Sequence, residues 1–146
     1  MSIAMPVTTR ANTRILRLQG GGLRFLDADD MSHRDFQVVT TPFQGFDGTQ
    51  HWRVTDLGGG LCTIQQVSSG RFLDAHETSP LDFRVVTRPR QRNDRQRWYI
   101  EDLGGGFVTV QQASSGRFLE ATVHGDFRVV TRPLGDTEQT WRLGDP

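Results

Sequence analysis

The sequence predicts an all-β fold closed by three copies of one unit, and two observations carry this prediction. The first is an internal repeat, in which Phe25, Phe72 and Phe118 stand at equivalent positions 47 and 46 residues apart. The second is a series of short strand-like runs separated by turn signals. A unit of about four short strands cannot bury its own apolar face, so three units are expected to close around a shared core.

Each unit contains the same three motifs in the same order. They are Arg-Phe-Leu-Asp/Glu-Ala, then Asp-Phe-x-Val-Val-Thr, then Gln-x-Trp. Their copies lie at 24–28, 35–40 and 50–52, at 71–75, 82–87 and 96–98, and at 117–121, 126–131 and 139–141. We therefore expect residues 1–146 to form a single domain of three repeats, at approximately 10–56, 57–102 and 103–146.

The local patterns indicate strands and tight turns. Residues 107–112 alternate apolar and polar side chains and are rich in β-branched types, which is typical of a half-buried strand. The Ser-Ser-Gly segment at 114–116 predicts a tight turn. Residues 83–87 predict another strand, which Pro89 ends. No segment sustains a helical period, so no long helix is expected.

Composition excludes several classes of function. The 17 acidic and 17 basic residues balance, so no overall attraction to nucleic acid or to an anionic membrane is expected. All the basic residues are arginines, which excludes a Schiff-base lysine. Cys62 is the single cysteine and lies in an alternating apolar run, which indicates a core position. The first ten residues lack a signal-peptide pattern, so the chain is expected in the cytoplasm or released without a classical leader.

Three Gln-x-Trp motifs in register resemble those of the ricin-B β-trefoil lectin family, over roughly residues 14–143. The resemblance implies a β-trefoil, which is a six-stranded barrel capped by three hairpins with pseudo-threefold symmetry. It also implies that the tryptophans lie in the core and that the glutamines stabilise the turns beside them. These residues are Trp52, Trp98, Trp141, Gln50, Gln96 and Gln139.

The same resemblance implies carbohydrate binding in up to three pockets, one per repeat. Its sugar-binding carboxylates correspond to Asp27, Asp74 and Glu120, and an ionised carboxylate makes charge-assisted bonds to adjacent hydroxyl groups. The polar side chains of the following strand are Gln37, Arg84 and Arg128. Valines stand where lectin members carry the aromatic ring that stacks on the sugar, so the sequence departs from a galactose pocket of the ricin kind.

The Phe-Arg-Val-Val stretch is also similar to the arabinose-binding trefoil modules of arabinofuranosidases. That resemblance implies a histidine and an aspartate from each repeat, with His33, His76 and His124 close to Asp35, Asp82 and Asp126. We expect glycan binding centred on Asp74 in the second repeat, whose loop also carries Asn93. The predicted carbohydrate-binding residues are Asp27, Gln37, Asp74, His76, Arg84, Asn93, Glu120, His124 and Arg128.

Each of these residues also has a structural interpretation. The Asp-Phe aspartates can close Asx turns, and the repeated arginines Arg24, Arg71 and Arg117 are typical of scaffold contacts. The arginine-rich segment 88–97 belongs to the second repeat alone and is typical of a solvated loop. The symmetry separates the repeated carboxylates too far for acid–base chemistry, so an enzyme is not expected. No His/Asp spacing suggests a metal site, so neither a metal nor another cofactor is expected.

Two functions from different classes follow. The first is a multivalent carbohydrate-binding lectin or module, whose partners are glycans and include neither nucleic acid nor a membrane. The second is a protein-interaction or inhibitor β-trefoil that acts through one loop, at 41–49 or 88–95. Motifs kept in all three repeats favour the first function.

Overall fold

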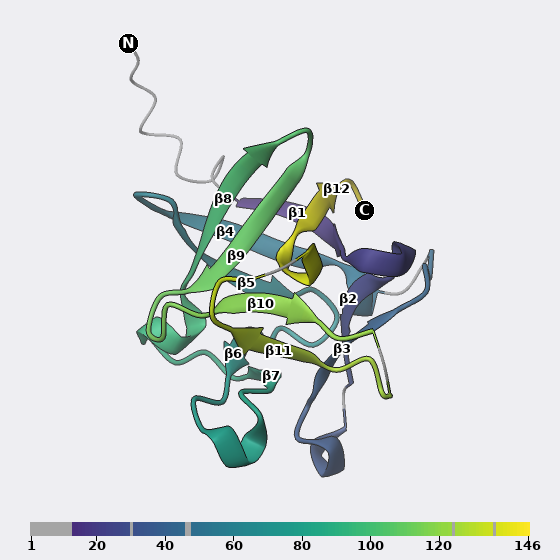
Figure 1. The fold of residues 1–146 in the computed structure, drawn as a ribbon, viewed down its shortest axis with the longest axis vertical. Helices are drawn as coiled ribbons and strands as arrows, with labels where there is room; N and C mark the ends of the chain where they lie inside the picture. The colour runs from purple at the N-terminus through teal and green to yellow at the C-terminus, as the bar shows by residue number, and fades with distance from the viewer. Residues whose placement is uncertain (1–12, 30, 46–47, 124, 136) are drawn as a thin grey trace.

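The computed structural model describes residues 13–29, 31–45, 48–123, 125–135 and 137–146. Twelve strands cover this part of the chain, joined by short loops that include single 3-10 turns (Figure 1). The strands are β1 Thr13–Gln19, β2 Phe25–Ala28, β3 Val38–Thr41, β4 Trp52–Gly58, β5 Leu61–Gln66, β6 Phe72–Ala75, β7 Val85–Arg88, β8 Trp98–Gly104, β9 Phe107–Gln112, β10 Phe118–Ala121, β11 Val129–Arg132 and β12 Trp141–Gly144. No helix in the described ranges is long and apolar enough to cross a bilayer.

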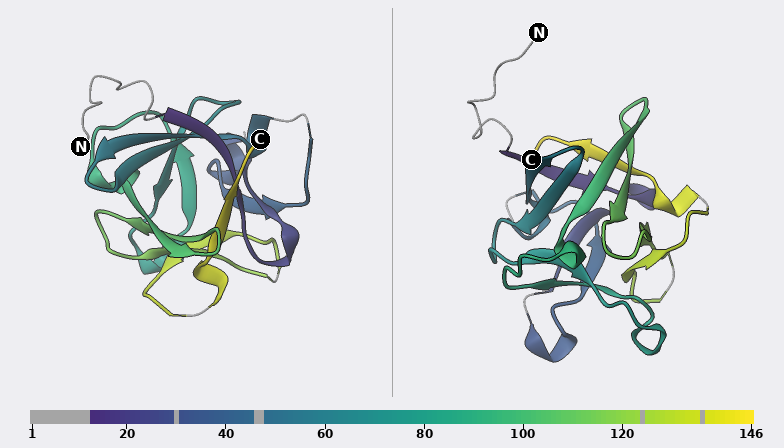
Figure 2. Two further views of the ribbon diagram at one scale, coloured as in Figure 1. Left: turned by 90° about the horizontal axis from the view of Figure 1, so that it is seen from above. Right: turned by 90° about the vertical axis from the view of Figure 1, so that its left-hand side faces the viewer.

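Six of the strands close into an antiparallel barrel. Strand β1 pairs with β4 and β12, β5 pairs with β4 and β8, and β9 pairs with β8 and β12, so the ring has no open edge (Figure 2). The remaining strands form the hairpins β2–β3, β6–β7 and β10–β11, which lie at one end of the barrel. This arrangement is a β-trefoil, and the predicted all-β fold with three repeats is confirmed.

The tryptophans of the Gln-x-Trp motifs form the centre of the core, as predicted. Trp52, Trp98 and Trp141 are fully buried. Each indole nitrogen donates to a leucine carbonyl of its own repeat, at 3.0, 3.1 and 3.0 Å. The polar atom of each large ring is therefore satisfied inside the core. Cys62 is also a core residue, and burial, with a smaller effect of the Asp56 charge, raises the pKa of its thiol to about 12.

The motif glutamines stabilise the loops beside the tryptophans, also as predicted. Gln96 accepts a hydrogen bond from the backbone nitrogen of Gln91 at 2.8 Å and donates to the carbonyl of Pro89 at 3.0 Å. Gln50 and Gln139 make the same pair of contacts in their own repeats. All three side chains are buried, so these bonds replace water that the amides lose on folding.

The second-repeat strand predicted at 83–87 starts later, at Val85. Asp82 and Phe83 have φ angles of 53° and 51°, in the left-handed region that side chains rarely adopt. This conformation turns the Phe83 ring under the guanidinium group of Arg117 in the third repeat, 3.7 Å from the ring centre. The prediction missed this turn because the alternation of apolar and polar side chains continues through it in the sequence.

The repeated arginines link the repeats, which confirms their scaffold role. Arg71 lies over Phe36 at 3.6 Å, and Arg24 lies over Phe127 at 3.6 Å, so each repeat stacks its arginine on the preceding repeat. Arg71 also donates to the hydroxyl and the carbonyl of Thr87, at 3.0 and 2.8 Å. The ring of contacts fixes the three hairpins against one another at the capped end.

Candidate functional site

The three hairpins meet around the pseudo-threefold axis. Single β-bridges join Gln37 to Val86, Arg84 to Val130, and Arg128 to Val39. Gln37, Arg84 and Arg128 hold equivalent positions in the three repeats, so the structure brings these predicted binding residues together at one end of the molecule. The junctions between repeats beside them are the candidate site.

At the junction of repeats 1 and 2, Asp35 contacts His76 and Arg88 of the second repeat. Its carboxylate lies 2.6 Å from Nη2 of Arg88 and 2.7 Å from Nε2 of His76. Burial alone raises the pKa of Asp35, but the hydrogen bonds and charges of His76 and Arg88 outweigh it and leave that pKa below 3.8. The histidine and aspartate that the sequence placed near each other within a repeat therefore pair across repeats.

The junction of repeats 2 and 3 follows the same plan. Arg132 donates to the Asp82 carboxylate at 2.7 Å and to the Asp82 carbonyl at 3.2 Å. Arg128 lies 3.8 Å from the second carboxylate oxygen of Asp82. An arginine at the end of β11 thus occupies this junction, as Arg88 at the end of β7 occupies the preceding one.

The junction of repeats 3 and 1 lacks such an arginine. The position equivalent to Arg88 and Arg132 is Thr41, whose hydroxyl donates to Asp27 at 2.6 Å within its own repeat. Asp126 instead accepts from the backbone nitrogen and from Nε of Arg128, both at 3.2 Å, which is the predicted Asx turn. At Asp35 and Asp82 the carboxylates bond to the next repeat.

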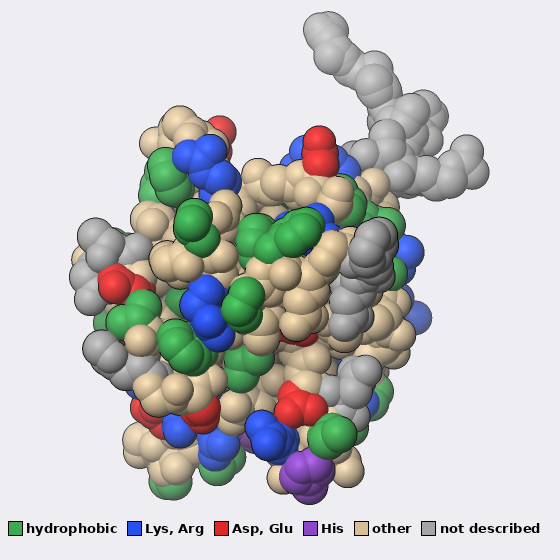
Figure 3. Space-filling model, turned by 90° about the vertical axis from the view of Figure 1, so that its right-hand side faces the viewer, with side chains coloured by type: hydrophobic (Ala, Val, Ile, Leu, Met, Phe, Trp, Pro, Cys, Tyr) green, Lys and Arg blue, Asp and Glu red, His purple; other side chains and the backbone are tan. Residues whose placement is uncertain are grey.

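A hollow of about 500 Å³ opens where this arginine is missing, and we call it the junction hollow. Its lining includes His33, Asp35, Gln37, Thr41, Arg84 and Asp126. One side of the molecule shows acidic, basic and histidine side chains gathered at the hairpin end (Figure 3). Two of the predicted binding residues, Gln37 and Arg84, therefore line the same hollow.

The junction hollow offers both hydrogen-bond acceptors and donors. Burial raises the pKa of Asp126, but the hydrogen bonds from Arg128 outweigh this effect and lower the pKa overall, so the carboxylate is ionised at neutral pH. Nε of Arg84 donates to the carbonyl of Leu81 at 3.2 Å, and its terminal nitrogens bond to no residue in the described ranges. Acceptors and donors on one concave surface suit a ligand with adjacent hydroxyl groups.

The predicted carboxylates of the Phe-Leu segments lie elsewhere, inside their repeats. Asp27 and Asp74 are 6% and 2% exposed. The Asp74 carboxylate accepts from the backbone nitrogen of Ala75 at 2.7 Å and from Nε2 of Gln96 at 3.1 Å. Glu120 is half-buried and accepts from Gln139 at 3.0 Å. Asp74 and Glu120 thus contact the glutamines of the Gln-x-Trp motifs, whereas Asp27 contacts Thr41 instead.

Asn93 lies apart from the junction hollow. Asn93 caps the 3-10 turn at Asp94–Gln96, where its side-chain oxygen accepts from the backbone nitrogen of Arg95 at 3.1 Å. It lines a second hollow, of about 240 Å³, together with Arg90 and Arg92. His124 lies outside the described residues.

Thr41 is the residue that sequence reasoning missed. The three strands after the Asp-Phe motif read Val-Val-Thr-Thr, Val-Val-Thr-Arg and Val-Val-Thr-Arg. Aligning them would have shown one threonine against two arginines. The alignment alone does not reveal that each arginine contacts an aspartate of the preceding repeat.

Comparison with known proteins assigns the family. Residues 48–129, more than half of the chain, match the ricin-type beta-trefoil lectin domain-like family. The protein therefore belongs to this family, which confirms the resemblance drawn from the Gln-x-Trp motifs. No curated protein matches the chain.

Several solved structures share the fold. The designed threefold-symmetric protein ThreeFoil is 27% identical, with a TM-score of 0.80 over 90% of this chain and 99% of that one. An exo-beta-1,3-galactanase from Clostridium thermocellum is 24% identical, with a TM-score of 0.80 over 99% of this chain and 32% of that one. The Macrolepiota procera ricin B-like lectin, solved with lactose, is 17% identical, with a TM-score of 0.73 over 91% of this chain and 96% of that one.

Proposed function

We propose that the protein binds carbohydrate and that the junction hollow is its principal glycan pocket. The observation that carries the proposal is Thr41, which leaves open the junction that Arg88 and Arg132 occupy elsewhere. Membership of a lectin-like family and the lactose-bound lectin of the same fold support glycan binding as the class of function.

Hydrogen bonds rather than ring stacking would hold the sugar. Asp126 and Asp35 line the hollow and carry acceptor oxygens, and Arg84 and Gln37 supply donors. Val39 also lines the hollow and offers an apolar surface to the C–H face of a sugar ring. A shallow site without an aromatic platform binds a single sugar weakly, so we expect recognition of an oligosaccharide that extends along the junction.

The prediction of up to three sugar pockets, one per repeat and centred on Asp27, Asp74 and Glu120, stays a prediction. A sugar hydroxyl would compete with the contacts that Asp27 makes to Ala28 and Thr41, that Asp74 makes to Ala75 and Gln96, and that Glu120 makes to Gln139. Displacing these contacts costs the free energy of the buried hydrogen bonds that are lost. We therefore place the principal pocket at the open junction.

The junction hollow is suited to binding rather than to glycoside hydrolysis. Hydrolysis needs one carboxylic acid that is protonated near neutral pH. The pKa values of Asp35 and Asp126 are both lowered, because hydrogen bonds and charges of His76, Arg88 and Arg128 outweigh the opposing effect of burial. Neither carboxylate is therefore prepared to donate a proton.

A glycan-array screen with two matched variants tests the proposal. Thr41→Arg places in the open junction the side chain that the other two junctions already contain. Thr78→Arg adds the same charge at an exposed position that does not line the junction hollow. We expect the wild type and Thr78→Arg to bind one glycan class and Thr41→Arg to lose it. Equal binding by all three proteins would place the glycan outside this hollow, and binding by none would reject the lectin function.

A second candidate function is a protein partner docked on the 88–95 loop. The observation that favours it is a pair of cationic side chains, Arg90 and Arg92, for which the described residues supply no carboxylate partner. Arg90→Ala/Arg92→Ala separates the two functions. Glycan binding that this variant retains supports a glycan pocket in the junction hollow. Loss of a co-purifying acidic protein supports a protein-docking site on the 88–95 loop.

A further inference from the structure

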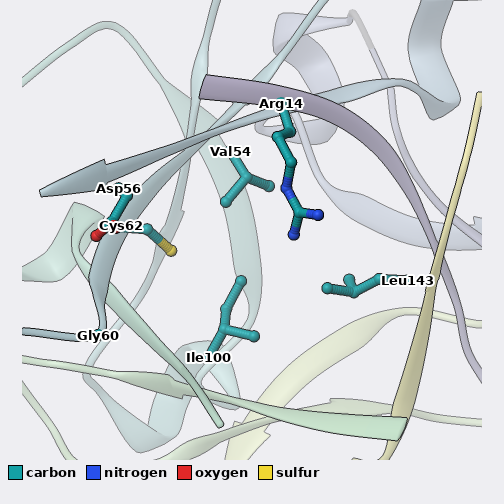
Figure 4. A pocket seen from close by; sticks show the side chains of 7 residues that line it. All are labelled: Arg14, Val54, Asp56, Gly60, Cys62, Ile100 and Leu143. Carbon is teal, nitrogen blue, oxygen red and sulfur yellow. The ribbon is translucent and has the colours of Figure 1, made fainter. Parts of the chain in front are cut away.

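A third hollow, of about 370 Å³, is lined by Gly60 and by residues of the barrel strands β1, β4, β5, β8 and β12, and by no residue of the hairpin strands. Three of its lining residues, Val54, Ile100 and Leu143, stand two positions after the three motif tryptophans and so repeat around the pseudo-threefold axis. They face one another around an open centre (Figure 4). We call this hollow, lined also by Arg14, Asp56, Gly60 and Cys62, the barrel mouth.

The floor of the barrel mouth is apolar. Val54, Ile100 and Leu143 are partly buried and pack against the core. Beside them the Cys62 side chain points inward and is 4% exposed (Figure 4). Its thiol is uncharged at neutral pH, because burial raises its pKa to about 12. An apolar group that entered the mouth would thus displace water from apolar surface, which is favourable.

One cation lies above this floor. The side chain of Arg14 extends from β1 into the mouth, and its guanidinium group lies between Val54 and Leu143 (Figure 4). Within the described ranges no hydrogen bond, ion pair or ring contact engages this group. The other charged lining residue is Asp56, which accepts from the backbone nitrogen of Gly58 at 2.8 Å and whose carboxylate points away from the centre.

We propose that the barrel mouth binds a small organic anion with an apolar body. Its carboxylate or sulfonate would pair with Arg14, and its apolar body would cover Val54, Ile100 and Leu143. The volume falls in the range of small-molecule sites. Glu101 and Asp102 line a neighbouring hollow on the Ile100 side, so like-charge repulsion directs the anionic group toward Arg14. This site is independent of the glycan pocket, which is lined by other residues.

Titration with octanoate, followed by methyl and guanidinium NMR signals, tests the proposal. We expect saturable shifts of the Val54, Ile100 and Leu143 methyl groups and of Nε–Hε of Arg14. Arg14→Gln keeps a polar side chain but shortens it and removes the charge, and we expect it to weaken binding up to about fivefold. Arg92→Gln removes an exposed arginine from a distant loop and should leave binding unchanged. Octanol, which lacks the charge, should bind the wild type more weakly than octanoate.

Two further variants separate the parts of the site. Asp56→Asn keeps the side-chain oxygen that bonds to Gly58 and removes a negative charge, so octanoate binding should become tighter. Ile100→Trp fills the mouth and should abolish binding while the amide spectrum remains that of a folded protein. Octanoate shifts confined to other surfaces, or binding that Arg14→Gln and Ile100→Trp leave intact, would overturn the proposal.

Discussion

Arg88 of the second repeat binds Asp35 of the first, with Nη2 of the arginine 2.6 Å from the carboxylate. The same arginine donates to the Asp35 carbonyl at 3.1 Å, so it holds both the side chain and the backbone of the neighbouring hairpin. Arg132 repeats this contact on Asp82. The three junctions are thus unequal: two are held by an arginine, and the third contains Thr41 and the junction hollow.

The first prediction concerns these two arginines. Arg88→Ala removes bonds to a carboxylate and to a carbonyl, and we expect it to lower the free energy of unfolding by about 1 kcal/mol, because the pair is partly exposed. Arg132→Ala should behave alike. Urea denaturation measures both, with Arg92→Ala as the control. An effect no larger than that of the control would mean that solvent screens these contacts.

The second prediction is that Thr41→Arg does not destabilise the fold. The new guanidinium group can reach Asp126 as Arg88 reaches Asp35, and Gln50 can then donate to Asp27 as Gln96 donates to Asp74. We therefore expect a melting temperature equal to or above that of the wild type. A fall of several degrees would indicate that the hydroxyl contacts of Thr41 are worth more than the new ion pair.

The third prediction concerns pH. The pKa of Asp35 is lowered in the folded protein, so its ionised form stabilises the fold above the ordinary value of 3.8 and this contribution disappears as pH falls through the lower folded value. Between about pH 6 and pH 3, the wild type should lose more stability than Asp35→Asn, which has no charge to lose. Because the carboxylate is 46% exposed, the difference should be modest. Urea midpoints at the two pH values measure it, and parallel losses would contradict the assignment.

The sequence predicted the features that repeat. The Gln-x-Trp motifs fix buried tryptophans and glutamines whose partners lie in the same repeat, as with Trp98 and Leu73. The burial of Cys62 follows from alternation within one strand. These are properties of local pattern, and three copies in register reinforce them.

Contacts between repeats could not be predicted in the same way. Arg88 and Asp35 are 53 residues apart, and nothing in either motif indicates that they meet across a junction. The left-handed backbone of Phe83 likewise accompanies a contact of its ring with Arg117 of the next repeat. The family resemblance also assigned a sugar-binding role to Asp74. It did not show that Ala75 and Gln96 already bond to this carboxylate.

The last prediction concerns Asp74, at which the sequence centred glycan binding. Asp74→Ala removes the acceptor of the backbone nitrogen of Ala75 and one of the two acceptors of Nε2 of Gln96, and an unsatisfied buried group costs about 1 to 3 kcal/mol. We therefore expect this variant to be less stable by about 2 to 4 kcal/mol. Asp74→Asn keeps one acceptor oxygen and should lose less.

Glycan binding of both Asp74 variants decides between the two locations for the pocket. If the glycan occupies the junction hollow, binding measured well below the melting temperature should remain at the wild-type level in Asp74→Asn, since Asp74 does not line that hollow. If Asp74 contacts the sugar directly, Asp74→Asn should lose binding although it stays folded. Calorimetric titration measures the glycan affinity of each variant, and a thermal melt shows whether the variant is folded. Together they separate loss of a ligand contact from loss of structure, which the array screen alone cannot do.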